Sequence, residues 1–323
     1  GPNSALLNQN MLHSDPPEHT RLRKLVSQAF TPRRVEALRP DVERVAERLL
    51  DPIAEAGRGD LVRDFAAPLP VTVICDVLGI PAARRADLGN WAGTMLAPPA
   101  DDPAAPARAV KELIGFLTAL IASKRDAPGD DILSALVAAR DEGDRLSEDE
   151  LTSLAFLILV AGYENSVHLI SGALLTLLQH PDQLRELRDD PALLPNAVRE
   201  LMRFEPPAPV SIRRFATEDL TLAGARIPAG DTVMIAIAAA DRDPARWPAP
   251  DTLDLRRETS AQLTLGHGIH YCLGAPLARL EGEVALAAVL RRLPALTLDT
   301  PPERLRWRNS YRSRALLSLP VRA

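Results

Sequence analysis

Apolar residues recur at helical spacing through most of the first two thirds of the chain. A window in which they return every three or four residues predicts an amphipathic helix. One of these windows opens with Ser147 and Glu150, the two ends of a capping box. On this basis helices are predicted over 18–28, 41–56, 68–78, 130–140, 147–180 and 192–204. This part of the chain is therefore expected to be mainly helical.

The spacing of apolar residues changes after Pro206-Pro207. Short runs with alternating polarity predict strands at 212–216, 220–227 and 232–237, and two more are expected near 295–299 and 315–321. Between them lies 241–271, a stretch with no periodic pattern, followed by a last helix at about 273–293. A patternless segment of that length is usually functional. The prediction is a mainly α protein with a small β portion, in one domain over 1–323.

The Pro- and Ala-rich segment 97–107 could be an interdomain linker. Because helical patterns resume within ten residues, an exposed loop between two helices is the better interpretation.

Composition and charge exclude several classes of protein. The net charge of −5 repels phosphate backbones, so nucleic-acid binding is not expected. The first ten residues contain no basic segment followed by an apolar run, the pattern of a signal peptide. The most apolar segment, 151–163, is short for a membrane span and is followed by Glu164, so a core helix is predicted. We expect a cytoplasmic protein with no membrane partner.

The two cysteines, Cys75 and Cys272, cannot form a disulfide framework or a four-cysteine metal site. Cys75 lies in an apolar helical run, VTVICDVL, and is interpreted as a buried core residue. Cys272 lies in a loop directly before the last predicted helix, where the helix N-terminus favours the thiolate. Cys272 is therefore the candidate ligand for a metal.

The loop around Cys272 reads LGHGIHYCLGAP, residues 265–276. Glycines let a backbone approach a flat ligand closely, and a thiolate is an axial ligand of haem iron. The loop resembles the haem-ligand signature of the cytochrome P450 superfamily, FGxGxHxCxG, with Leu265 where Phe is usual. By this resemblance Cys272 is the iron ligand, and Gly266, His270 and Gly274 are further haem-binding positions.

Other motifs of the family match in order. Glu200 and Arg203 resemble its ExxR pair, and only this copy of the six ExxR matches precedes the Pro-Pro break. The family joins that pair to a second arginine, for which Arg257 is the candidate, and the trio has a structural role. The resemblance also implies which residues bind the haem propionates: His19, Arg23, Arg214 and His270. Here Arg214 is chosen over the adjacent Arg213.

The segment AGYENS, 161–166, resembles the AGxET(T) motif of the family's long central helix, which lies over the haem. Ala161 and Gly162 are expected to contact the cofactor and oxygen. The family's acid–alcohol pair relays protons, but Asn165 stands where Thr is usual. An amide can donate and accept hydrogen bonds but does not easily pass a proton. Glu164, Asn165 and Ser166 are the catalytic candidates, with water or a substrate hydroxyl completing the relay.

The resemblance implies a monooxygenase that uses haem b and O2 to oxidise an apolar or amphiphilic small molecule in secondary metabolism. Electrons would come indirectly from NAD(P)H through a ferredoxin reductase and a ferredoxin, which would dock near Arg21, Lys24 and Arg279. A monomer is expected. Family members usually carry several dozen residues before the first motif matched here, so N-terminal helices and strands are expected to be missing or shortened. Two alternatives stay open: a haem-binding auxiliary protein without oxygen activation, and a member that uses peroxide or performs oxidative coupling.

Overall fold

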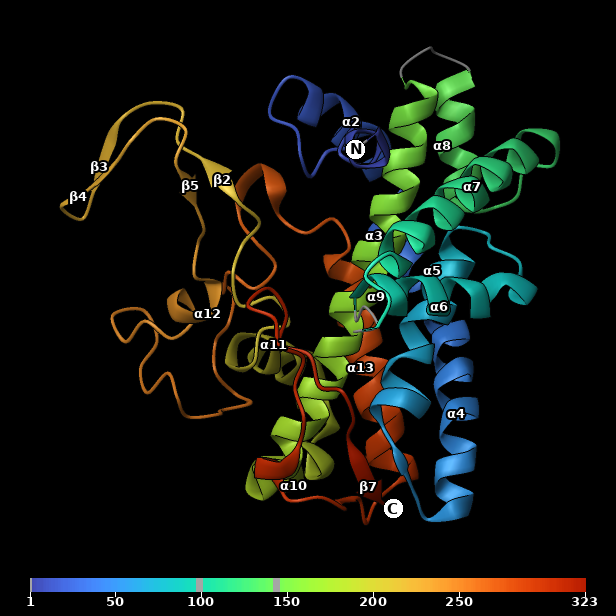
Figure 1. Ribbon diagram of the computed structural model, residues 1–323. Coiled ribbons are helices and arrows are strands. Elements are labelled where there is room, and N and C mark those ends of the chain that lie inside the picture. Colours follow the sequence, from blue (N-terminus) through green and yellow to red (C-terminus); the bar gives the residue numbers. More distant parts are fainter. Residues whose placement is uncertain (1, 97–100, 142–145) are drawn as a thin grey trace.

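The computed structural model describes residues 2–96, 101–141 and 146–323. Its centre is the long helix α9 (Glu148–Gln179), which runs through the molecule (Figure 1). Ser147 caps this helix with the expected capping box, in which its hydroxyl accepts from the Glu150 amide. Most residues of α9 before Phe156 and after Asn165 are buried. The helix therefore forms the core of the fold, and the other helices are arranged around it.

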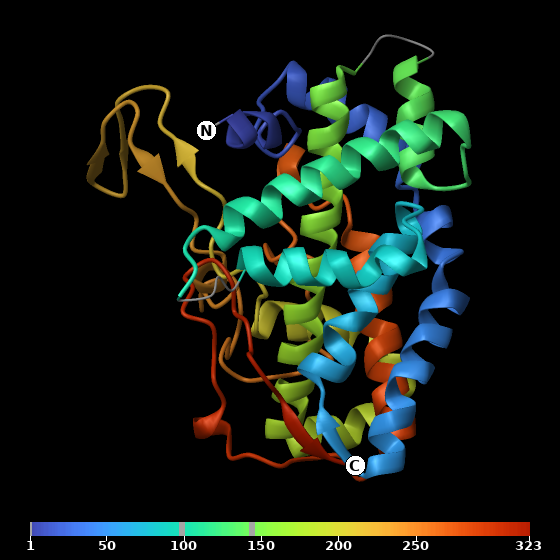
Figure 2. The ribbon, with the colours of Figure 1, turned by 45° about the vertical axis from the view of Figure 1, so that its right-hand side comes forward.

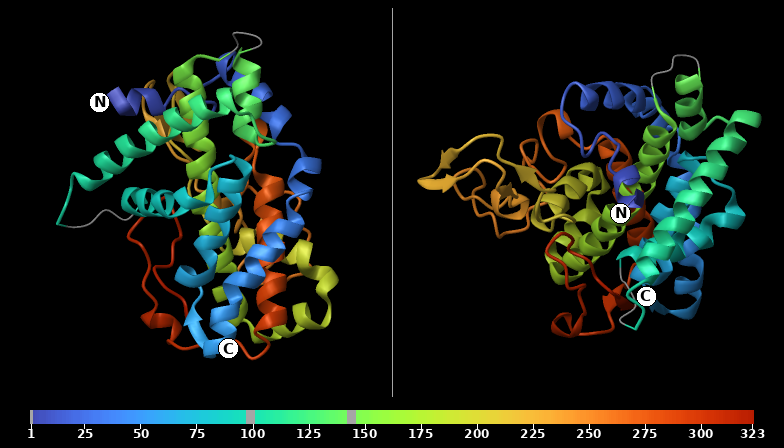
Figure 3. Two further views of the ribbon diagram at one scale, coloured as in Figure 1. Left: turned by 90° about the vertical axis from the view of Figure 1, so that its right-hand side faces the viewer. Right: turned by 45° about the horizontal axis from the view of Figure 1, so that its top comes forward.

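Helices from both halves of the sequence pack against α9. These are α1 (Pro2–Leu7), α5 (Pro68–Val77), α7 (Ala105–Asp126), α8 (Ile132–Asp141), α10 (Pro181–Asp189), α11 (Leu194–Phe204) and α13 (Ala275–Arg292). The outer helices are α2 (Glu18–Ala29), α3 (Pro32–Glu36), α4 (Arg39–Ala56) and α6 (Arg85–Leu96), with the short α12 (Ile237–Ala240) in the second half. Helices α4 and α13 lie side by side (Figure 3).

The β portion is small. Strands β1 (Arg58–Asp60), β7 (Pro320–Arg322) and β6 (Thr297–Leu298) form an antiparallel sheet in that order. Strand β2 (Arg214–Phe215) pairs with β5 (Thr232–Val233), and β3 (Leu220–Leu222) pairs with β4 (Ala225–Ile227). The β3–β4 hairpin projects from the helical body (Figures 1 and 2). The predicted fold class, mainly α with a small β portion, is confirmed.

The predicted helices agree with the structure to within about two residues at each end, and 241–271 is largely irregular. The strands predicted over 315–321 and 232–237 are wrong for most of their length, because only Pro320–Arg322 and Thr232–Val233 pair with neighbouring strands. The residues before Pro320 instead form a loose hairpin with a single bridge, Trp307 to Leu316. The run 220–227 is a hairpin of two strands rather than one strand. Of the segment 97–107, residues 97–100 lie outside the described part, and α7 begins at Ala105.

Helix α9 is longer and more apolar than the segment 151–163 suggests. Among the helices the structure describes, it is the one with the length and hydropathy of a membrane span, with a mean hydropathy of 1.4 over 18 residues. More than half of that window is buried inside the protein, and five long helices pack on α9. These contacts support the interpretation of α9 as a core helix.

Candidate functional site

The Cys272 loop is shaped by two glycines with positive φ. Gly266 has φ +79° and Gly268 has φ +67°, values that residues with a side chain rarely adopt. A Cβ atom at Gly266 would also lie 3.2 Å from the carbonyl oxygen of His270. The amide of Cys272 donates to the Leu265 carbonyl at 2.7 Å, which closes the loop. Cys272 therefore lies in a closed loop, three residues before Ala275, the first residue of α13.

Cys272 is exposed to solvent, yet protein atoms surround its sulfur closely enough for burial to raise the pKa of the thiol. Both observations fit a side chain that many protein atoms surround without covering it completely. The amide of Gly274 and the charges of Arg23 and Arg279 act in the opposite direction and favour the thiolate. The helix N-terminus by itself therefore does not ionise Cys272. A bound metal cation would do so, because a coordinating thiol is deprotonated.

A group of cationic side chains gathers beside the loop. The rings of His19 and His270 lie 4.5 Å apart, and Arg23 donates to the Tyr271 carbonyl at 2.6 Å. Burial lowers the pKa of both histidines, and Arg23 lowers both further. Arg214 acts on His270 and is half-buried, whereas Arg213 is exposed. The structure thus brings together the four residues predicted to bind propionates.

His19 in this group has unmet hydrogen-bonding capacity. Its ring is buried, and neither Nδ1 nor Nε2 has a hydrogen-bond partner of good geometry among the described residues, although the Ile269 backbone lies close enough to raise its pKa. A buried polar group without a partner costs about 1–3 kcal/mol. Asp15 is the acidic residue that acts on His19 and His270. An anionic group at this place would satisfy His19 and the nearby guanidinium groups.

The middle of α9 is exposed, although the helix is buried on either side. Ala161 and Asn165 are both exposed, and they lie four residues apart, on one face of the helix. Gly162 does not lie on this exposed face. A Cβ atom there would lie 2.6 Å from Cδ1 of Ile74, so this glycine permits close packing of α9 against α5. The helix also continues through Gly162 without a break. The structure therefore gives Gly162 a packing role that the sequence did not predict.

Glu164 is bound by two groups that the sequence analysis missed. Its Oε1 accepts from Nη1 of Arg308 at 2.6 Å and lies 3.4 Å from Nε2 of His168, one turn further along α9. Burial, the largest influence, raises the pKa of Glu164, but the contacts with His168 and Arg308 outweigh it and the pKa lies below its usual value. Glu164 is therefore an ionised carboxylate at neutral pH.

Ser166 faces away from Asn165 and into the core. It is buried, and its hydroxyl lies close enough to Glu281 of α13 to favour the ionised carboxylate of that residue. Neither carboxyl oxygen of Glu281, however, has a hydrogen-bond partner of good geometry among the described residues. Complete burial prevails and raises the pKa of Glu281 to about 8. The sequence does indicate that Glu281 is buried, because this residue occupies an apolar position of the helix, between Leu277, Leu280 and Val284.

Glu200, Arg203 and Arg257 meet as the sequence predicted. Nε and Nη2 of Arg203 donate to the two oxygens of Glu200 at 2.7 and 2.8 Å, and both side chains are fully buried. Nε of Arg257 donates to Oε1 of Glu200 at 3.1 Å. The remaining donors of the two arginines reach backbone carbonyls of residues 241–252. The trio thereby fixes the path of the irregular segment that leads to Cys272.

Asp241 is a second anchor of that segment, and the sequence analysis did not identify it. Its Oδ1 accepts from the Leu263 amide and its Oδ2 from the Thr264 hydroxyl, both at 2.7 Å. The same hydroxyl oxygen lies 3.0 Å from the Met202 carbonyl oxygen on α11. These bonds hold the start of the Cys272 loop against the end of α11.

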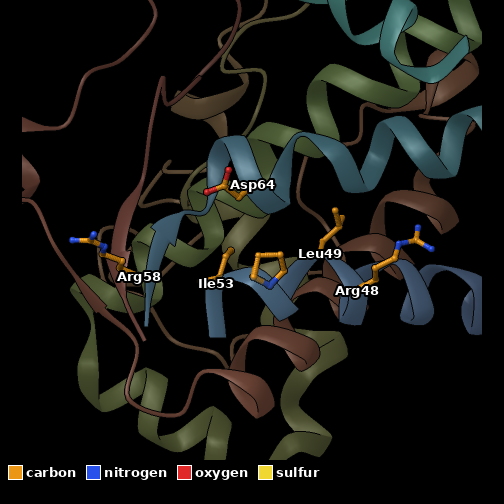
Figure 4. A pocket seen from close by; sticks show the side chains of 6 residues that line it. Arg48, Leu49, Ile53, Arg58 and Asp64 are labelled. Atoms are coloured by element: carbon orange, nitrogen blue, oxygen red, sulfur yellow. The ribbon is translucent and has the colours of Figure 1, made fainter. Parts of the chain in front are cut away.

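These features fit a haem. An exposed thiol among closely packed protein atoms could supply an iron ligand. Ala161 and Asn165 leave one face of the central helix uncovered, which a flat ligand could occupy. The His19 ring near Arg23, together with His270 near Arg214, matches a carboxylate-bearing edge. A separate surface pocket of about 330 Å³ is lined by Arg48, Leu49, Pro52, Ile53, Arg58 and Asp64 (Figure 4). None of the candidate residues lines it.

Comparison with known proteins identifies similar chains. The family model for cytochrome P450 matches residues 104–317. The chain is 49% identical over 321 residues to cytochrome P450 monooxygenase PikC of Streptomyces venezuelae, covering 98% of this chain and 77% of that one. It is 48% identical to the 6-deoxyerythronolide B hydroxylase of Saccharopolyspora erythraea, with 97% and 78% covered. The structure of PksS, the cytochrome P450 of the bacillaene polyketide synthase of Bacillus subtilis, superimposes with a TM-score of 0.95 at 40% identity, covering 99% of this chain and 82% of that one.

Proposed function

Since this chain belongs to the cytochrome P450 family of monooxygenases, we propose that it inserts one oxygen atom from O2 into an apolar or amphiphilic secondary metabolite. Membership implies haem and O2 as cofactor and co-substrate. The hydroxylase relative acts, by its name, on 6-deoxyerythronolide B, and PksS belongs to a polyketide synthase. A macrolide- or polyketide-like substrate is the class that these names and the apolar centre of α9 support.

The residues assigned to the cofactor follow from the site geometry. Cys272 would ligate the iron, with Gly266 and Gly274 allowing the close approach of the backbone. His19, Arg23, Arg214 and His270 would bind the propionates, and the exposed Ala161 would face the ring. When bound, the thiolate-ligated haem supplies the centre at which O2 is activated with two electrons. The whole chain, 1–323, is proposed to act as one domain around this group.

Proton delivery is the part of the reaction that this chain's own residues perform. Each turnover consumes O2, two electrons and two protons, and yields one hydroxylated product and one water. Ionised Glu164 takes up protons, and the exposed Asn165 amide orients a water beside it, since an amide cannot itself relay a proton. Ser166 does not take part in this relay, because its hydroxyl lies in the core near Glu281.

The source of electrons is proposed to be a ferredoxin and its NAD(P)H-dependent reductase. The protein would act in the cytoplasm as a monomer. The docking surface is proposed around α2 and the start of α13, where Lys24 is exposed and Arg279 donates to the Tyr271 hydroxyl at 2.8 Å. Arg21 of the same surface forms an ion pair with Glu150 and is assigned no role in docking.

The observation that carries this proposal is the exposed Cys272 thiol in a glycine-shaped loop beside unpartnered His19. Reduced protein bound to carbon monoxide is expected to show the red-shifted Soret band of thiolate ligation. Cys272→Ala should abolish that band. Cys75→Ala, the matched control, should keep it, because Cys75 is buried in the core and burial raises the pKa of its thiol to about 11. An unchanged band in Cys272→Ala would rule out the assignment.

A second measurement separates the enzyme from a haem-binding auxiliary protein, the alternative that Asn165 favours. Substrate-dependent oxygen uptake with surrogate redox partners, matched by hydroxylated product, is expected. Haem binding without such uptake would support the auxiliary protein. Faster product formation with peroxide alone than with the electron-transfer chain would support a peroxide-using member.

A further inference from the structure

We propose that Arg308 is a positioning residue for proton delivery, which fixes one oxygen of Glu164 and leaves the other free to exchange protons. The inference rests on the role given to Glu164 in the proposed function. It starts from the ion pair between the C-terminal hairpin and the central helix, in which Nη1 of Arg308 lies 2.6 Å from Oε1 of Glu164. Both side chains are 21% exposed, so this contact is shielded from solvent but not sealed.

Both partners of Glu164 bind the same oxygen. Arg308 and His168 contact Oε1, and no hydrogen bond or ion pair to Oε2 occurs among the described residues. A carboxylate held at one oxygen keeps a fixed orientation, while its second oxygen can accept a proton from water and donate it to another water. Each such cycle returns Glu164 to its ionised form. The arrangement is that of a proton shuttle whose two oxygens have different tasks.

The position of Arg308 is fixed by pairing within the C-terminal hairpin and by the anchoring of the hairpin's opposite arm. Its backbone amide donates to the Ala315 carbonyl at 2.8 Å, next to the bridge between Trp307 and Leu316. Arg314, in the opposite arm of the hairpin, donates from its amide to the Pro207 carbonyl at 2.9 Å and forms an ion pair with Glu205. The C-terminal segment, drawn in red in Figures 1 and 2, thus presents a guanidinium group at a defined place on α9.

The charges around Glu164 explain why Arg308 matters more than a neutral donor would. After burial, the groups that act on the pKa of this carboxylate are His168 and then Arg308, and both lower it. The pKa of the adjacent Tyr163 is raised by its own burial and further by the charge of Glu164. Burial favours the neutral acid of Glu164, and Arg308 is the permanently charged partner that opposes it. Without Arg308, Glu164 would hold its proton to a higher pH and would release it less readily.

The test uses the haem-loaded protein with Arg308→Gln, Arg308→Lys and Glu164→Gln, and Arg306→Gln as the matched control. Arg306 lies in the same hairpin, and its side chain is exposed. The pKa of Glu164 is read from its infrared carboxyl band, assigned by its loss in Glu164→Gln. Coupling is the hydroxylated product formed per NAD(P)H consumed, with hydrogen peroxide quantified in parallel, as a function of pH.

In Arg308→Gln we expect the pKa of Glu164 to rise, and the acid side of the coupling profile to move to higher pH by the same interval. Arg308→Lys should largely restore both values, and Arg306→Gln should leave both unchanged. The double variant Glu164→Gln/Arg308→Gln should couple no worse than Glu164→Gln alone, because the two residues act as one unit.

The proposal requires the pKa of Glu164 and the acid side of the coupling profile to move together in every variant that folds. It can therefore still be tested with Arg308→Lys alone if Arg308→Gln is unstable. A variant in which one readout moves without the other overturns it, as does an Arg308→Gln protein that matches the parent in both. Failure of the underlying function looks different. In that case Glu164→Gln itself would couple as well as the parent.

Discussion

At the scale of single residues, the structure contains two glutamates whose surroundings shift their pKa in opposite directions. Glu164 is kept ionised by Arg308 and His168, whereas complete burial raises the pKa of Glu281 to about 8. The native state therefore binds a proton at Glu281 more tightly than the unfolded chain, whose glutamates titrate near 4.5. The stability contribution of this proton is fully present below the unfolded pKa and is lost as pH rises towards 8.

Glu281→Gln is expected to become more stable relative to the parent as pH rises from 5 to 8, by at most about 1.4 kcal/mol per pH unit. Gln has a similar shape and no charge to bury, which is the physical reason. Denaturant unfolding at three pH values measures the difference. Glu283→Gln, two residues away and paired with Arg39 at 3.1 Å, is the control and should not show this trend. If the free energy of unfolding of Glu281→Gln differed from that of the parent by the same amount at every pH, the raised pKa assigned to Glu281 would be wrong.

At the scale of elements, the Glu200–Arg203–Arg257 trio connects α11 to the irregular segment 241–271. Replacing Glu200 with Ala leaves the buried guanidinium group of Arg203 and the partly exposed one of Arg257 without their carboxylate. Removing one partner of a buried ion pair typically costs about 3–5 kcal/mol. We expect Glu200→Ala to lower soluble yield and haem content together. The chain supplies its own control in Glu36 and Arg39, the same ExxR spacing on the surface, with exposed fractions of 62% and 32%. Glu36→Ala should cost about 1 kcal/mol or less. Equal losses of soluble yield and haem content in Glu200→Ala and Glu36→Ala would show that burial of the trio does not determine its contribution.

At the scale of the whole molecule, the net charge of −5 opposes an acidic electron donor, so docking must depend on a local basic surface. Lys24 lies on α2 next to Arg23, which contacts the backbone of the Cys272 loop. Lys24→Glu is expected to raise the KM for ferredoxin several-fold and to weaken its dependence on salt, without changing the product formed per electron. Steady-state kinetics at several ionic strengths test this. Lys111→Glu on α7 makes the same charge change away from the loop and should have little effect. If Lys24→Glu and Lys111→Glu raised the KM for ferredoxin equally, the change in net charge would explain the effect and a local docking surface would not.

The sequence by itself determined the Cys272 loop and seven of the described helices: α2, α4, α5, α8, α9, α11 and α13. The other described helices, the long α7 among them, were not predicted. Periodicity, caps and glycines with positive φ act over a few neighbouring residues, so their effects can be read locally. It also determined the partnership of Glu200 with Arg203, which are one helical turn apart. The strand expected over 315–321 was wrong, because pairing depends on which neighbour lies beside a segment, and only Pro320–Arg322 meets one.

Only the tertiary structure decided which side chains act on the central helix. Arg308 lies 144 residues from Glu164, Ile74 of another helix explains Gly162, and Ser166 turns to Glu281 rather than to Asn165. Electrostatic and steric effects of this kind depend on distance in space and on burial. No pattern of spacing along the chain contains either quantity. The motif therefore identified Glu164, but packing of the C-terminal hairpin against α9 gave that carboxylate its charge and its orientation.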